Sequence, residues 1–143
     1  MMTFGMENSL SEQLYSINNL QQEYIQHRLK RIDLNTQQAR TLNYIFSNSG
    51  TIQKELAIYL GKQDATITNL LKTLEKKHYI TREIPENNER QKKLYLTDKG
   101  ITAVQEIQAI FIELEEALSS LLTKSEQATT KQLLKKIQQH FPK

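Results

Sequence analysis

The segment from Gly61 to Thr97 most constrains the fold of this chain, because it places two kinds of periodicity next to each other. Its first part, from Asp64 to Lys77, repeats apolar residues at helical spacing. Its second part contains two runs that alternate apolar and polar side chains, as strands do, separated by the polar segment PENNERQK at 85–92. A short amphipathic helix followed directly by such a hairpin predicts a helix-turn-helix with a β-hairpin wing, a unit that usually holds duplex DNA.

The predicted helix from Asp64 to Lys77 has one apolar and one polar face. At about 100° per residue, four apolar side chains fall within a narrow arc: Ile67, Leu70, Leu71 and Leu74. The opposite face offers amide, hydroxyl and ammonium groups, which bind base edges and phosphates in a DNA groove. We therefore expect a recognition helix with DNA contacts at Gln63, Ala65, Thr66, Thr68, Asn69, Lys72 and Lys76. The alternative is an ordinary helix that shows such side chains to water.

The two alternating runs after this helix, residues 79–84 and 93–97, predict the strands of the wing. The apolar side chains expected to cover the helices are Ile80, Ile84, Leu94 and Leu96. The connecting segment is longer than the about two to five residues that close a purely structural hairpin. Because a narrow minor groove concentrates negative potential, wing contacts are expected from Asn88, Arg90 and Lys92. Glu86 and Glu89 oppose such contacts, so a solvated loop is the alternative.

Helical patterns precede this segment. We expect a long helix over residues 7–31 with apolar side chains on two faces, and a second helix over 37–47. Thr51 is expected to cap a third, short helix. The inward-facing residues of that helix are expected to be Ile52, Leu56, Leu60 and either Ile58 or Tyr59. Gly61 then supplies the positive φ that ends this helix and forms the turn.

Beyond Gly100 the apolar residues follow a regular spacing of alternating three and four positions. They are Val104, Ile107, Phe111, Leu114, Leu118 and Leu121. A seam with a period of about 3.5 favours packing against another helix along its whole length. A last helix over residues 125–140 adds further apolar side chains. These helices therefore favour a homodimer, and the alternative is that they pack on one another within one chain.

The composition limits which functions are possible. The 143 residues contain no Cys, which excludes disulfides, thiolate metal sites and cysteine-based catalysis. The three His are too scattered for a metal site, and the sequence shows no nucleophile–base pair, phosphate loop, signal peptide or membrane-spanning run. We therefore expect a cytoplasmic protein, not an enzyme, without metal or cofactor. The net charge of +3 is concentrated between residues 50 and 100, where ten basic residues stand against seven acidic ones.

Several short motifs, taken in order, resemble those of the MarR family of transcriptional regulators over nearly the whole chain. The motifs are Leu34-Asn35-Thr36-Gln37-Gln38, Gln53-Lys54-Glu55-Leu56-Ala57, Thr66-Ile67-Thr68 with Leu74-Glu75-Lys76-Lys77, and Arg90 with Leu94-Tyr95-Leu96-Thr97-Asp98-Lys99-Gly100. Residues 66–71 and 111–115 are similar to a branch that represses multidrug-efflux pumps. The chain departs from the family at His78, where Gly is usual, and at Asn69 and Asn88, where Arg and Asp are common. Without those two charges, the wing is expected to be positioned by neutral hydrogen bonds.

The expected architecture is a mainly α chain with a small β-hairpin wing. Residues 34–98 are expected to form a winged helix-turn-helix that binds double-stranded DNA, and residues 1–33 and 99–143 a helical dimerisation lobe. A symmetric dimer implies a pseudo-palindromic operator. The resemblance implies a repressor released by a small lipophilic or phenolic effector, whose candidate lining residues are Tyr15, Tyr24, His27, Phe46 and Phe111. The competing function is a winged-helix adaptor that dimerises and binds protein instead of DNA.

Overall fold

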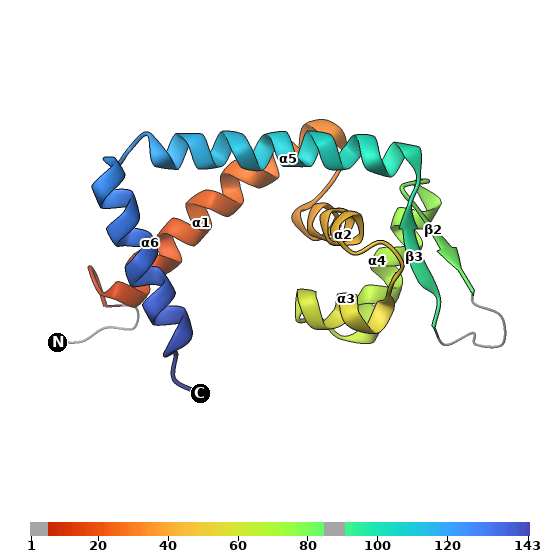
Figure 1. Cartoon of the computed structure of the whole chain (residues 1–143), viewed down its shortest axis with the longest axis horizontal. Coiled ribbons are helices and arrows are strands. Elements are labelled where there is room, and N and C mark those ends of the chain that lie inside the picture. The colour runs from red at the N-terminus through yellow and green to blue at the C-terminus, as the bar shows by residue number, and fades with distance from the viewer. Residues whose placement is uncertain (1–5, 85–90) are drawn as a thin grey trace. The chain divides into compact units, whose positions relative to one another are not determined.

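The computed structural model describes residues 6–84 and 91–143, and this part of the chain is mainly helical with one small antiparallel sheet (Figure 1). In chain order the elements are α1 (Leu10–Leu29), the 3-10 helix η1 (Lys30–Ile32), α2 (Thr36–Ser47), β1 (Thr51–Ile52), α3 (Gln53–Leu60), α4 (Asp64–Lys76), β2 (Ile80–Glu83), β3 (Lys93–Leu96), α5 (Asp98–Ser119) and α6 (Lys124–Gln139). The expected fold class is confirmed. Asn88 and Arg90 lie outside the described residues.

The chain forms two compact units, Met1–Ile110 and Phe111–Lys143. The core of the first unit consists of side chains that are almost completely buried: Leu29, Leu42, Ile45, Leu56, Ile67, Leu71, Leu74, Ile80, Leu94, Val104 and Ile107. In the second unit, Thr123 and Glu126 form a capping box at the start of α6, and Gln127 Nε2 donates to the Ser119 carbonyl at 2.9 Å. The boundary between the two units lies within α5, so the units do not coincide with the two predicted lobes. The division into a dimerisation lobe and a DNA-binding lobe stays a prediction.

The apolar face of α4 packs as expected, because Ile67, Leu70, Leu71 and Leu74 are all buried. Ahead of it, Asn35 and Gln38 form a capping box that begins α2. Among the described residues no helix is both long enough and apolar enough to cross a membrane.

The expected role of Thr51 is wrong. Thr51 does not cap α3 but lies in β1, where it pairs with Leu94 and makes β3 the central strand in the order β1-β3-β2. Its hydroxyl donates to Glu55 Oε2 at 2.7 Å, and Ile52 is the residue that precedes the helix. A strand of two residues has no periodicity, so the sequence pattern could not indicate it.

Ile58, Tyr59 and Ile84 come from two segments in which an inward-facing side chain is predicted, and all three are exposed. Ile58 is 73% exposed and Tyr59 is also exposed, although one of them was expected to face inward; Tyr59 instead stacks on Tyr44 with ring centroids 4.5 Å apart. Ile84 is 55% exposed and lies beyond the end of β2 at Glu83.

Both helices of the helix-turn-helix end in a left-handed residue. Gly61 closes α3 with a φ of 65°, as expected. At the end of α4, His78 has a φ of 66°, and the N–H groups of His78 and Tyr79 donate to the carbonyls of Glu75 and Leu74, each at 3.0 Å. This is the Schellman arrangement, which usually uses glycine. His78 therefore adopts the left-handed conformation that glycine usually supplies at this position.

Replacing His78 with glycine should raise the free energy of unfolding by about 1 kcal/mol. Left-handed backbone costs a residue with a Cβ about 1–2 kcal/mol, and the greater freedom of glycine in the unfolded chain offsets part of that gain. Thr97 Oγ1 donates to the main-chain carbonyl of residue 78 at 2.6 Å, so this bond should persist. Urea unfolding followed by circular dichroism measures the change, and a less stable variant would contradict the prediction.

Candidate nucleic-acid interface

The polar face of α4 is free, as its sequence pattern predicts. Six of the seven residues expected to contact DNA are exposed: Gln63, Ala65, Thr66, Asn69, Lys72 and Lys76. The buried face of the same helix holds it on the core of the first unit. Neither Lys72 nor Lys76 makes a hydrogen bond or ion pair with another described residue, so both ammonium groups can bind an external anion.

Thr68 differs from the other six because its hydroxyl is used within the protein. Its Oγ1 donates to the Asp64 carbonyl at 2.9 Å and accepts from Gln53 Nε2, also at 2.9 Å. The Gln53 amide comes from the start of α3, so this contact joins the two helices of the helix-turn-helix. The Thr68 hydroxyl proton is therefore used within the protein, so the hydroxyl cannot donate to a DNA phosphate while this bond is kept.

An ion pair joins the wing to the last turn of α4. Arg82 Nε lies 3.1 Å from Glu75 Oε2, and Arg82 Nη2 lies 3.2 Å from Glu75 Oε1. The Arg82 side chain is only 15% exposed, so the pair lies partly under the protein surface. A charged pair thus helps to position the base of the wing, whereas the expectation of neutral hydrogen bonds in place of charges at Asn69 and Asn88 stays a prediction, because Asn88 lies outside the described residues. The role of Arg82 was not predicted from the sequence. The alternation of side chains along β2 could have indicated it, because Arg82 lies on the same face of the strand as the buried Ile80.

We expect Arg82→Ala to lower the free energy of unfolding by about 1–2 kcal/mol, because it removes two charge-assisted hydrogen bonds and the packing of the arginine stem. A double-mutant cycle with Glu75→Gln should give a coupling energy of about 1 kcal/mol. Glu83→Ala is the matched control, since Glu83 is exposed on the same strand, and it should stay within about 0.5 kcal/mol of the wild type. A coupling energy near zero would show that the pair contributes nothing.

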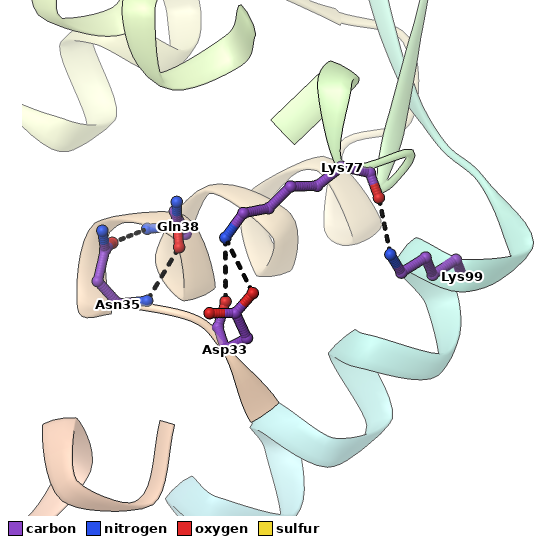
Figure 2. A network of polar contacts seen from close by, with 5 residues as sticks. All are labelled: Asp33, Asn35, Gln38, Lys77 and Lys99. Atoms are coloured by element: carbon purple, nitrogen blue, oxygen red, sulfur yellow. Dashed lines mark hydrogen bonds and ion pairs between the residues drawn. The ribbon is translucent and has the colours of Figure 1, made fainter. Parts of the chain in front are cut away.

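Two further lysines of the basic middle segment are also bound within the protein (Figure 2). Lys77 Nζ lies 3.2 Å from the Asp33 carbonyl oxygen and 3.4 Å from Asp33 Oδ2. Lys99 Nζ donates to the Lys77 carbonyl at 2.8 Å and lies 4.5 Å from the centroid of the Tyr79 ring. The excess of basic residues in this segment is therefore larger than the number of cations that are available to DNA. Lys92, next to the part of the wing that lies outside the described residues, is exposed.

The residues expected to line an effector site lie on three helices. Tyr15 and Phe46 are exposed, His27 is exposed on α1, and the Tyr24 ring carries the Arg28 guanidinium 3.3 Å from its centroid. Phe111 belongs to the second unit. These positions leave the effector site a prediction.

Comparisons with known proteins give one consistent result. The sequence profile of the MarR family matches residues 34–92. YwaE, an HTH-type transcriptional regulator of Bacillus subtilis (strain 168), is 33% identical over 84 residues, which are 59% of this chain and 49% of that protein. The match with this curated relative thus spans about half of its length.

The solved structures match over nearly the whole chain. A protein from Clostridium acetobutylicum, described as a MarR family transcriptional regulator, is 41% identical with a TM-score of 0.68, and the match covers 90% of this chain and 95% of that chain. MepR of Staphylococcus aureus in complex with DNA is 29% identical with a TM-score of 0.84, over 95% and 100% of the two chains. MepR is described as a transcription regulator of the multidrug efflux pump MepA.

Proposed function

Because the chain belongs to the MarR family of transcriptional regulators, we propose that it is a sequence-specific DNA-binding repressor. It binds a pseudo-palindromic operator as a homodimer and is released by a small molecule. The observation that carries DNA binding is the exposed polar face of α4, which is held in place by a buried apolar face and whose two ammonium groups have no partner in the part of the chain that the structure describes. The whole-chain likeness to MepR, which was solved with DNA, supports the same function.

In this proposal, α4 lies in the major groove and the wing in the minor groove. Asn69 can bind an adenine edge through both ends of its amide, and Thr66 can place its methyl group against thymine. Lys72 and Lys76 bind phosphates, together with Lys92 and with Arg90 and Asn88 of the wing. Since the helix offers one amide and no arginine, most of the affinity comes from phosphate contacts.

Exposed apolar side chains support the homodimer. On α1 they are Leu10, Leu14, Tyr15, Ile17 and Leu20, and in the second unit they are Ile112, Leu121, Leu122, Leu133, Leu134, Ile137 and Phe141. Within α1 only Ile25 and Leu29 are buried. Monomeric proteins rarely expose large apolar patches, and a second copy of the chain would cover side chains of this kind. In this proposal, residues 1–33 and 99–143 form the dimerisation lobe, and residues 34–98 bind the DNA.

The effector is proposed to be lipophilic or phenolic, supported by the description of MepR as the regulator of a multidrug efflux pump. Tyr15, Tyr24, His27, Phe46 and Phe111 are the residues proposed to line its site. An effector releases the protein only if it binds the DNA-free arrangement more tightly than the DNA-bound one.

The test is a gel-shift titration with the duplex DNA that lies upstream of the gene, at several salt concentrations. A DNA-binding repressor should bind this duplex with an affinity that falls steeply as salt rises, because bound lysines release counterions. Sedimentation of the free protein and of the complex measures the stoichiometry, which should be two chains per operator. Absence of binding at low salt would contradict the proposal and favour the adaptor function.

A further inference from the structure

Lys77 connects three segments that are far apart in the sequence (Figure 2). It is the C-cap residue of α4. Its ammonium group reaches Asp33, 44 residues earlier, and its carbonyl accepts a hydrogen bond from Lys99, 22 residues later. Asp33 follows η1, and Lys99 lies in the first turn of α5. The end of the proposed recognition helix is thus bonded to the turn before α2 and to the start of α5.

Asp33 and Lys99, the two partners of Lys77, lie at the boundaries between the two proposed lobes. The chain passes between the proposed dimerisation lobe and the DNA-binding lobe at two points only, after residue 33 and before residue 99. Both crossing points carry a partner of Lys77. A movement that carries either crossing point away from the end of α4 therefore stretches or breaks a hydrogen bond made by Lys77.

We infer that Lys77 is a positioning residue that holds the recognition helix in register with both connections to the dimerisation lobe, and is not a phosphate contact. The DNA-dependent part of this inference rests on the proposed function. The Asp33 turn, the end of α4 and the first turn of α5 move together while the bonds of Lys77 are intact. Breaking them lets the recognition helix lose the orientation that a two-fold operator requires.

The Lys77 ammonium group has two acceptors on Asp33, the carboxylate and the main-chain carbonyl oxygen, and they do not hold it equally well. The Asp33 side chain is 90% exposed, and an ion pair of this kind is weak in water. The Asp33 carbonyl is a fixed acceptor, because the residue has a left-handed φ of 58° and the next N–H, that of Leu34, donates to the Leu29 carbonyl at 3.1 Å. The Lys77 side chain is only 33% exposed. We therefore assign the positioning role mainly to the bond with the carbonyl.

Hydrogen exchange of the DNA-free protein tests the positioning role without any reference to DNA. In Lys77→Gln, the amides of Leu34 and Tyr79 should exchange about three- to tenfold faster than in the wild type, since both segments lose the same anchor. Lys76→Gln is the matched control, because it removes the same charge from the adjacent exposed position, and it should leave both rates unchanged. Lys99→Met, which retains an apolar stem over Tyr79, should speed exchange at Tyr79. Unchanged exchange at both Leu34 and Tyr79 in Lys77→Gln overturns the inference.

Salt titration of DNA binding separates positioning from phosphate contact. A lost phosphate contact lowers the slope of log affinity against log salt by about 0.9 for each protomer, whereas a lost positioning bond lowers affinity without changing the slope. We expect Lys77→Gln to bind up to about fivefold more weakly with the wild-type slope, and Lys76→Gln to show the reduced slope. A reduced slope in Lys77→Gln overturns the inference. If the wild type fails to bind duplex DNA, the proposed function fails, and the exchange rates alone decide whether Lys77 anchors the helix.

Discussion

Replacing Gly100 with alanine should lower the free energy of unfolding by about 3 kcal/mol. Gly100 is buried in the first turn of α5, and a Cβ at this position would lie 2.2 Å from the Tyr79 carbonyl oxygen, 3.2 Å from its carbon and 3.3 Å from Leu96 Cβ. The closest of these atoms belongs to the main chain, so no rotamer change can relieve the clash. Inserting a carbon atom into such a site costs about 1–3 kcal/mol and sometimes more, and the absence of a flexible neighbour places this case at the upper end.

The consequence reaches the proposed DNA-binding helix, because Tyr79 is the residue whose N–H closes the C-terminal end of α4. The Tyr79 carbonyl also accepts from the Thr97 amide at 3.0 Å, so displacing it disturbs the start of β2 and the exit of β3 together. Thermal unfolding followed by circular dichroism measures the effect, at one fixed protein concentration because dimerisation changes the apparent stability.

Gly61→Ala is the matched control for Gly100→Ala. Gly61 has a φ of 65°, but a Cβ there meets nothing within 4 Å. Its cost is therefore backbone strain alone, about 1 kcal/mol after allowing for the lower entropy of alanine in the unfolded chain. Equal losses in the two variants, or a smaller loss at Gly100, would contradict the steric argument.

Sequence reasoning predicted the parts of this fold that carry a long periodic signal. The buried face of α4, the turn glycine Gly61 and the two longer strands follow from apolar spacing and from the conformational freedom of glycine. It failed where a contact between distant residues decided the structure. Thr51 would suit a helix cap or a strand, and only its pairing with Leu94 selects the strand.

The candidate site shows the same division. Exposure of the polar face of α4 was predictable, because it is the complement of the buried face. The sequence could not tell which cations are already bound within the protein, because an ion pair depends on three-dimensional distance. Arg82 and Lys77 both belong to the basic segment, but Arg82 is held by the Glu75 carboxylate, and Lys77 is held by the main-chain carbonyl and the carboxylate of Asp33. Net charge therefore indicates the class of partner better than it indicates the contacts.

Replacing both Lys72 and Lys76 with glutamine should produce the largest loss of DNA affinity, at least about a hundredfold at 0.1 M salt. Both side chains are exposed on α4, and neither has a partner among the described residues, so their substitution should leave the fold intact. In a dimer, two lysines on each protomer would be lost, and the slope of log affinity against log salt should fall by about 3 to 4. Gel-shift or fluorescence-anisotropy titrations at several salt concentrations measure both quantities.

The control is the double substitution of Lys131 and Lys135 with glutamine, which removes the same charge from exposed positions on α6. If the lysines of α4 act by contact, this control should retain nearly all of the affinity and the wild-type slope, because it removes no charge from α4. Equal losses in the two double variants would mean that total charge, not position, determines binding. A fall in slope of only about 1.8 in the α4 variant would mean that two phosphate contacts are lost per dimer instead of four, which contradicts the assignment of both lysines on both protomers to phosphates.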